Sequence, residues 1–229
     1  MKLYTYFASS GAYRVRIALA LKGLKADMEF VNLTKGEQQS SAYAAINPQR
    51  LVPSFIDDGN VLTQSLAIIE YLEEKYPAPP LLPLTPVERA RARAIAHAMA
   101  SDIGPLNNLK IRKYIKTTLR IDEREWIQHW TQDGLTGVEA MLAKSPETGR
   151  FCHGAFPTLA DCVLVPQLYH ARRFGCNLSA FPTLTRIEAT CNELPAFQQA
   201  HPANQPDATE QANGAQGRAG NSRISPRKS

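Results

Sequence analysis

The feature that most constrains the fold is a proline-rich break near residue 80, because the patterns on its two sides differ. Before the break, alternating apolar runs and helical patterns follow the order strand, helix, strand, helix, strand, strand, helix. The stretch from Tyr76 to Pro83 contains four prolines and cannot continue a helix. After Pro86 every patterned segment is helical. The sequence therefore predicts an α/β domain over residues 1–80 and an all-α domain over residues 87–203.

The α/β domain is predicted to contain a mixed sheet. A helix between the first two strands favours a parallel crossover connection. The segment Asp57–Asn60 is typical of a hairpin turn, which makes the last two strands antiparallel. This βαβαββα order is the plan of a thioredoxin-like domain. The expected strands are 2–7, 28–33, 52–56 and 61–63, and the expected helices are 13–21, 41–46 and 66–75.

The all-α domain is predicted to begin with a long helix that Gly104–Pro105 should kink. Thr158 and Asp161 have the spacing of a capping box, which marks the start of a buried central helix. Two final short helices are expected after it. Besides the central helix, the expected helices are 87–119, 122–142, 182–192 and 195–200.

The last segment, residues 204–229, has a composition that argues against folding. It contains one isoleucine and no aromatic residue, which is too little apolar surface to offset the entropy of ordering the chain. We therefore expect a disordered tail whose removal is harmless. The tail carries two of the five net positive charges, and the rest of the chain is too weakly basic to indicate a nucleic-acid partner.

Several absences from the sequence bear on location and chemistry. No apolar run reaches the length of a membrane helix, and the N-terminus has no signal-peptide core. These absences predict a cytoplasmic protein without a membrane partner. The four cysteines form no CxxC pair and no histidine cluster has zinc spacing, so no metal site is expected.

Three segments, in this order and spacing, resemble the zeta class of glutathione transferases. They are Tyr6–Leu19, Asn47–Pro53 and Gln64–Leu72, and similarity continues to about residue 203. That family includes maleylacetoacetate isomerase and the maleylpyruvate isomerases. The resemblance therefore implies a homodimeric, glutathione-dependent isomerase of the glutathione transferase fold. Its substrate would be a small dicarboxylic acid from aromatic amino acid catabolism.

Ser9 and Ser10 lie where a strand gives way to a helix. Amides at a helix start point outward, and the helix dipole there favours an anion. A sulfur atom at this position would be held as a thiolate, with a lowered pKa. From spacing alone, either serine could instead be a simple helix cap. The resemblance implies that Ser9 is the main donor to the glutathione thiolate, with Ser10 beside it.

Further positions match the family's glutathione site. The resemblance implies a cis bond before Pro53, which turns the N–H and C=O of Val52 toward an extended peptide. A trans proline at the start of an edge strand is the alternative. Gln64 and Ser65 correspond to the site of the γ-glutamyl carboxylate, although a plain helix cap also fits them. Gln49 corresponds to a family residue near the glycyl end of glutathione.

Two residues of the all-α domain are carried over in the same way. Arg173 matches an arginine that faces the substrate cavity, although Arg172 and Arg173 together also suit a solvated helix face. Asn108 matches a polar residue that lines the glutathione cleft from the partner subunit, or it caps the kink. Arg14 and Arg16 are expected to be structural or to lie at the surface, because they follow the site by more than one helical turn.

The implied reaction requires no metal. The glutathione thiolate would add to the conjugated cis double bond of maleylacetoacetate, and the resulting single bond would rotate. Elimination would then return glutathione together with the trans product, so glutathione acts as a cofactor.

The chain departs from the family pattern at Ala8, Gly11 and Gly104, where relatives often have arginine, cysteine and Gln or His. The changes at Ala8 and Gly104 remove polar groups that could anchor the substrate. Three alternatives therefore stay open, which are a maleylpyruvate isomerase, a broad transferase acting on α-halo acids, and a binding module of the same fold without activity.

Overall fold

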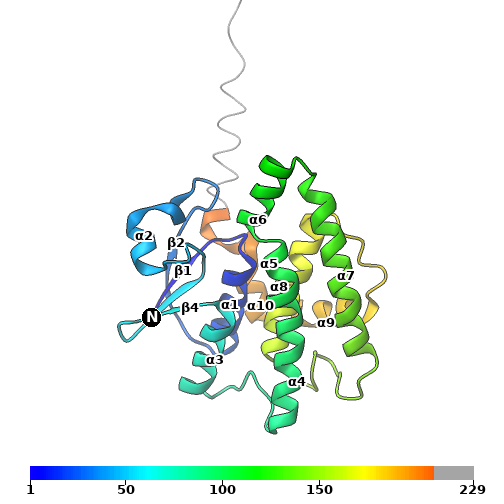
Figure 1. Ribbon diagram of the computed structural model, residues 1–229. Coiled ribbons are helices and arrows are strands. Elements are labelled where there is room, and N and C mark those ends of the chain that lie inside the picture. The colour runs from blue at the N-terminus through cyan, green and yellow to red at the C-terminus, as the bar shows by residue number, and fades with distance from the viewer. Residues whose placement is uncertain (209–229) are drawn as a thin grey trace, which may run out of the picture.

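The computed structural model describes residues 1–208, so residues 209–229 of the predicted tail lie outside the described part. An α/β part and a helical part lie side by side (Figure 1). Near the end of the described range, the chain returns from the helical part and packs on helix α1.

The α/β part is built on a sheet with the strand order β2-β1-β3-β4. β2 is parallel to β1, and the other two pairs are antiparallel, so the predicted mixed sheet is confirmed. Leu3 faces Phe55 across β1 and β3, and both side chains are fully buried. The strands are β1 (Lys2–Thr5), β2 (Asp27–Phe30), β3 (Ser54–Asp57) and β4 (Asn60–Thr63).

The helices of the α/β part follow polar residues, and the cap at Ser9 was predicted. Ser9 caps the first helix, Ser40 caps the second, and Gln64 precedes the third. The first strand ends two residues earlier than expected, because the chain turns back and the N–H of Ser9 donates to the Tyr6 carbonyl at 3.0 Å. The helices are α1 (Ser10–Leu21), α2 (Ser41–Ile46) after a short 3-10 turn, η1 (Glu37–Gln39), and α3 (Ser65–Lys75).

The proline-rich connection after α3 is held by a buried ion pair. The Nζ of Lys22 lies 2.8 Å from the carboxylate of Glu73, and both side chains are almost completely excluded from solvent. Lys22 also donates to the carbonyls of Tyr76 and Pro79. Glu73 accepts from the N–H groups of Leu81 and Leu82. The connection is therefore fixed to the α/β part rather than loose.

The predicted single helix over 87–119 is wrong, because helical turns run from Pro86 to Leu106, stop at Asn107 and resume at Leu109. Pro105 has no N–H to donate, and the turns just before it widen to π-helical geometry. The chain then restarts at Asn108, which caps the next helix. The pieces are α4 (Pro86–His97), η2 (Ala98–Ile103), α5 (Gly104–Leu106), α6 (Leu109–Tyr114) and η3 (Ile115–Leu119).

Helix α8 (Leu159–Arg173) is the centre of the core, as predicted. Its capping box is present, because Asp161 accepts from the Thr158 N–H at 2.7 Å and Thr158 accepts from Ala160. The helix contacts α1, α4 and α9, so one apolar core runs through both parts of the chain. No helix within residues 1–208 combines the length and apolarity needed to cross a bilayer. The other helices are α7 (Glu123–Ala143), α9 (Pro182–Asn192), α10 (Pro195–Ala200) and η4 (Pro202–Asn204).

The chain remains ordered beyond residue 203, so the predicted start of the tail is too early. Gln205 and Asp207 are buried. The side-chain amide of Gln205 donates to the carbonyls of Gln199 and His201 at 3.0 and 3.1 Å. Apolar composition misses this segment because polar contacts to the main chain of earlier residues, rather than apolar burial, attach it.

Candidate active site

The loop between β1 and α1 places Ser9 at the N-terminus of a helix, as predicted. Its Oγ accepts from the Ala12 N–H at 3.2 Å and lies 3.5 Å from the carbonyl oxygen of Val52. Ser10 is the first residue of α1, and both serines are half-buried. No acidic residue occupies the first turn of α1, so the helix end keeps its preference for an anion.

The Val52–Pro53 bond is cis, as the resemblance implied. This peptide bond lies close to the start of α1. A Cβ atom on Gly11 would lie 3.0 Å from the Pro53 ring and 3.8 Å from the Ser9 Oγ. The absence of a side chain at Gly11 therefore allows this close approach of the loop to the helix.

Gln64 and Gln49 meet at the other strand-to-helix junction. The Gln64 side-chain amide donates to the Gln49 side-chain oxygen at 2.8 Å. Gln64 has a φ of 68° and a ψ of 116°, which is a costly backbone conformation for a residue other than glycine. Such strain concentrates at functional sites. Ser65 follows directly and is 7 % exposed.

Arg14 is buried beside Ser65, so of the two roles expected for it the surface role is wrong. Its side chain is 6 % exposed and its Nη1 donates to the Ser65 Oγ at 3.3 Å. Its buried Nε has no hydrogen-bond partner among residues 1–208, and no acidic side chain in that range pairs with it. Burial lowers its pKa to about 10. A buried cation without a counter-ion is costly, so this position favours an anionic ligand.

Arg16 has the structural role that was expected. Its Nε donates to the Ala200 carbonyl at 3.1 Å, and its two Nη atoms donate to Thr5, Tyr6 and Phe7. It therefore joins the loop before Ser9 to the end of α10.

The structure separates Arg173 from its neighbour Arg172. Arg172 forms an ion pair with Glu188, whereas Arg173 is exposed and forms no ion pair within the described part of the chain. This exposed position fits both roles that the sequence left open, and contact of Arg173 with a substrate stays a prediction.

His170, one turn before Arg173 on α8, is a neighbour that sequence reasoning missed. Burial lowers its pKa to about 4, and the positive charges of Arg112, Arg173 and Arg14 lower it further in that order. His170 therefore lies close enough to all three arginines to feel their charge. Its spacing of three residues from Arg173 is the signal that could have found it.

Asn108 is half-buried and caps α6, with its Oδ1 accepting from the Lys110 N–H at 3.1 Å. This is one of the two roles that the sequence left open. A contact from Asn108 to glutathione in a partner subunit stays a prediction.

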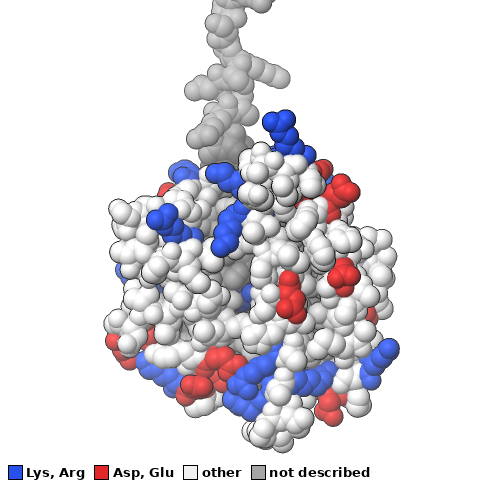
Figure 2. All heavy atoms as spheres, viewed as in Figure 1, with Lys and Arg blue, Asp and Glu red and all other residues white. Residues whose placement is uncertain are grey.

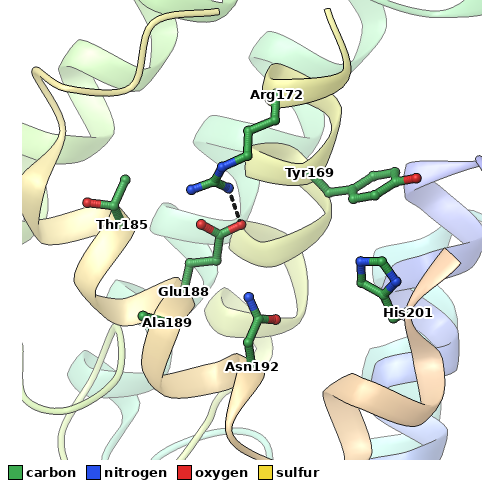
Figure 3. Close-up of a pocket in the computed structure, with 7 residues that line it drawn as sticks. All are labelled: Tyr169, Arg172, Thr185, Glu188, Ala189, Asn192 and His201. Carbon is green, nitrogen blue, oxygen red and sulfur yellow. Dashed lines mark hydrogen bonds and ion pairs between the residues drawn. The ribbon is translucent and has the colours of Figure 1, made fainter. Parts of the chain in front are cut away.

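The face between the α/β part and the helical part is hollowed, and Lys and Arg side chains border the hollow (Figure 2). A separate cavity of about 330 Å³ lies between α8 and α9 (Figure 3). None of the predicted site residues lines it. It is lined by Tyr169, Arg172, Thr185, Glu188, Ala189, Asn192 and His201.

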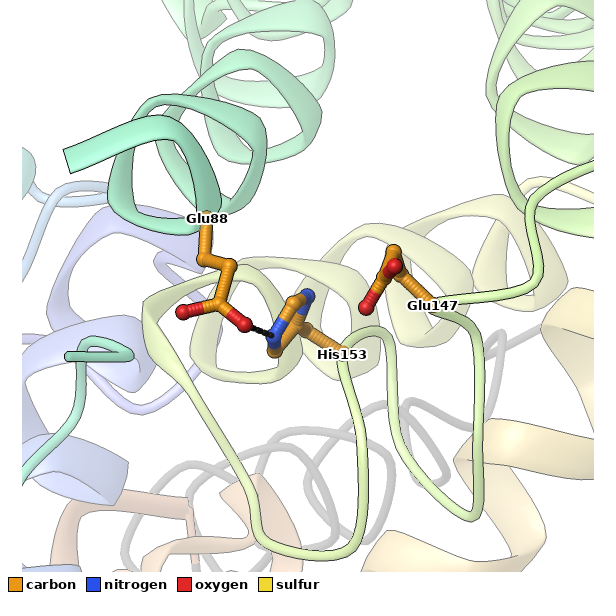
Figure 4. Close-up of side chains that lie close together, drawn as sticks. All are labelled: Glu88, Glu147 and His153. Atoms are coloured by element: carbon orange, nitrogen blue, oxygen red, sulfur yellow. Dashed lines mark ion pairs between the residues drawn. The ribbon is translucent and has the colours of Figure 1, made fainter. Parts of the chain in front are cut away.

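Glu88, Glu147 and His153 bring ligand-type atoms within 4.8 Å of one another (Figure 4). The Nη1 of Arg91 lies 3.2 Å from the His153 Nδ1. Because a guanidinium only donates, Nδ1 accepts and Nε2 carries the proton. That Nε2 faces Glu88 at 3.8 Å. The cluster therefore fits a hydrogen-bonded link between α4 and the loop after α7 better than a set of metal ligands.

Comparison with known proteins covers 90 % of the chain. The profile of the family "Glutathione S-transferase, N-terminal domain" matches residues 3–80. The maleylacetoacetate isomerase of Pseudomonas aeruginosa is 49 % identical over 212 residues, covering 90 % of this chain and 98 % of that protein. A holo structure of maleylpyruvate isomerase, described as a bacterial zeta-class glutathione transferase, is 45 % identical with a TM-score of 0.89. It covers 90 % of this chain and 99 % of that one.

The chain belongs to the zeta class of glutathione transferases. A third relative, the maleylacetoacetate isomerase of Anaeromyxobacter dehalogenans, was solved with glutathione bound in its active site. It is 44 % identical with a TM-score of 0.82, and covers 90 % of this chain and 97 % of that one. The predicted family and the predicted glutathione transferase fold are both confirmed for this zeta-class chain.

Proposed function

We propose that this protein is a glutathione-dependent cis–trans isomerase that converts maleylacetoacetate to fumarylacetoacetate. The observation that carries the proposal is the geometry of α1. Its capping residue Ser9 lies next to the Val52 carbonyl, while Arg14, from the same helix, reaches Ser65. One helix thus serves the expected positions of both the sulfur and the γ-glutamyl end of one glutathione molecule.

The residues present fit glutathione. The buried Nε of Arg14, without a partner in residues 1–208, supports a carboxylate at Ser65. Ser65 would donate to the same carboxylate from the start of α3. The main chain of Val52 would pair with the cysteinyl portion, and Gln64 with Gln49 would cover the remaining peptide.

Bound glutathione supplies the thiolate that adds to the cis double bond and is later released. Ser9 would donate a hydrogen bond to the sulfur from its hydroxyl, and Ser10 would present an additional donor. These donors, together with the helix dipole, stabilise the charged form of the thiol more than the neutral form, and this lowers its pKa. A lower thiol pKa provides more nucleophile at neutral pH.

The dicarboxylate requires cationic partners. Arg173 has no ion pair among the described residues and would bind one carboxylate. His170 is neutral near pH 7 because its pKa is lowered, so it can donate a hydrogen bond without adding charge. These two residues lie on the same face of α8, which would direct the substrate toward the start of α1.

A second substrate is the alternative because two anchoring side chains of the family are missing. A Cβ at Gly104 would lie in van der Waals contact with Arg14, 3.6 Å from its Nη2, so a polar side chain at this position would have been next to Arg14. With Ala8 as the other missing anchor, maleylpyruvate is the alternative diacid. Transfer of glutathione to α-halo acids, and binding without catalysis, are the remaining alternatives.

The proposal also includes the location, the oligomeric state and the pathway of the enzyme. We propose a cytoplasmic homodimer acting in the catabolism of aromatic amino acids. In that dimer Asn108 would approach the glutathione of the partner subunit.

The test is comparative turnover of maleylacetoacetate and maleylpyruvate in the presence of glutathione. We expect kcat/KM to favour maleylacetoacetate by about tenfold or more, because a site built for one diacid loses affinity for another of different length. The reverse preference would make the protein a maleylpyruvate isomerase. Glutathione binding without turnover of either diacid would support the binding module.

A further inference from the structure

The segment after α10 reaches back to the loop that carries Ser9. The Oδ2 of Asp207 accepts from the Phe7 N–H at 2.7 Å, although 200 residues separate the two in sequence. Asp207 is 8 % exposed. The contact is therefore a shielded hydrogen bond to a charged acceptor, which is stronger than a bond between neutral groups.

The same short loop is held from its other side by Arg16. The Nη2 of Arg16 donates to the Phe7 carbonyl at 3.1 Å, and its Nε donates to the Ala200 carbonyl. Both main-chain groups of Phe7 are thus bound by side chains, one of them from the far end of the described chain. The charges of Asp207 and Arg16 also attract each other.

Ser9 lies two residues beyond Phe7 and shares its turn, since the Ser9 N–H donates to the Tyr6 carbonyl. A shift of Phe7 would therefore move Ser9 and the start of α1. Catalytic groups need placement to within about half an ångström. Among residues 1–208, the hydrogen bonds of the Ser9 hydroxyl are those with the Ala12 N–H and, at 3.5 Å, the Val52 carbonyl.

We infer that Asp207 is a positioning residue for Ser9, which fixes the Phe7 main chain so that the Ser9 hydroxyl meets the glutathione sulfur. This inference rests on the proposed function. It makes the ordered end of the chain part of the catalytic machinery, although Asp207 itself touches no substrate.

The direct charge effect of Asp207 has the opposite sign. A nearby carboxylate disfavours a second negative charge and raises the pKa of a thiol. Removing that charge alone would therefore lower the thiol pKa, whereas losing the position of Ser9 would raise it. The direction of the change distinguishes the two effects.

The experiment titrates the thiol of bound glutathione through the ultraviolet absorbance of the thiolate, in full-length protein. Asp207→Ala removes the acceptor, and Asp207→Asn keeps an acceptor of the same reach without the charge. Gln205→Ala is the matched control, because Gln205 anchors the same segment to α10 without contacting the loop. Isomerase kcat and melting temperature are measured alongside.

We expect Asp207→Ala to raise the pKa of the bound thiol by about one unit and to lower kcat at neutral pH by roughly tenfold or more. Asp207→Asn keeps the acceptor and removes the charge, so its thiol pKa should be equal to or slightly below that of the wild type. Gln205→Ala should lower the melting temperature and leave the thiol titration unchanged.

The inference is overturned if Asp207→Ala keeps the wild-type thiol titration, whatever its melting temperature. It is also overturned if the thiol pKa of Asp207→Ala falls below that of the wild type. If the alanine variant does not fold, Asp207→Glu gives the same decision, because it displaces the acceptor by one methylene group. A wild-type protein that does not lower the pKa of glutathione would instead contradict the proposed function.

Discussion

At the scale of single residues, two arginines are proposed to bind different anions, Arg14 the glutathione and Arg173 the substrate. Arg14 is buried, and its Nη1 donates to the Ser65 hydroxyl. Arg173 is exposed on α8, and no carboxylate of residues 1–208 pairs with it. The first position suits a ligand that is held tightly and regenerated. The second suits a substrate that must enter and leave.

Replacing each arginine by methionine should therefore have different effects. Arg14→Met should weaken glutathione binding by roughly ten- to a hundredfold, because a buried charge pair is lost. The unliganded protein should be as stable as wild type or more stable, since an unpaired buried cation is removed. Calorimetry with glutathione and thermal melting measure both quantities.

Arg173→Met is the matched control for that variant. It should leave the affinity for glutathione unchanged and raise KM for the diacid by about tenfold or more. An Arg14→Met protein that binds glutathione as tightly as wild type would remove Arg14 from the site.

Ser9 both caps α1 and is proposed to bind the sulfur, and two substitutions separate these roles. Ser9→Ala should destabilise the protein by about 1 kcal/mol through the lost cap, and should raise the thiol pKa by about one to two units. Ser9→Asn retains a good cap, so it should recover the stability but not the activity. The pH–rate profile and urea unfolding measure the two effects. An unchanged profile in both variants would exclude Ser9 from the mechanism.

The position of Arg14 shows why some site residues cannot be read from spacing alone. Arg14 is four residues after Ser10, which places both on one face of α1. Helical side chains also lean toward the N-terminus, so a long side chain one turn later reaches back to the site. Its contact with Ser65 additionally depends on how α3 packs on α1, and no local pattern contains that information.

At the scale of elements, the segment 202–208 behaves as part of the fold. A chain ending after Ala203 loses the contacts of Gln205 and Asp207, so its melting temperature and its isomerase activity should both fall. A chain ending after Ala208 keeps these contacts and should match the full-length protein in both. Equal activity of the two truncated chains would contradict a role for this segment.

The helices and strands were predictable in type but not in every boundary. Caps such as Ser9, Thr158 and Asp161 have local signatures, and the structure confirms them. The division of the segment around Pro105 was only partly predictable. A missing N–H predicts a kink, but the widening of Ala98–Ile103 depends on packing against α7 and α8.

At the scale of the whole molecule, stability should depend on pH through His170. Its pKa is about 4 in the folded protein and about 6.5 in an unfolded chain. Between these values the unfolded state binds more protons, so stability is complete above about pH 6.5 and is lost as the pH falls toward 4. The slope from this residue is at most about 1.4 kcal/mol per pH unit.

Urea unfolding from about pH 7 to about pH 5 measures this slope. His170→Asn should flatten it. His97→Asn, which changes an exposed histidine on α4, should leave it unchanged. Identical slopes in wild type and His170→Asn would show that His170 does not titrate as its surroundings indicate.

The plan of the molecule was predictable because it depends on strong local patterns. The proline-rich break, the hairpin at Asp57–Asn60 and the helical periodicity after Pro86 together define the two parts. The buried pair of Lys22 with Glu73, which fixes the connection between them, was not predictable, because its partners are 51 residues apart.

The measurement that tests the central claim most directly is the isomerisation of maleylacetone, a stable stand-in for maleylacetoacetate, followed by absorbance with and without glutathione. We predict turnover that depends strictly on glutathione and that falls steeply in Ser9→Asn. Isomerisation at the same rate without glutathione, or no isomerisation by a protein that binds glutathione, would contradict the account.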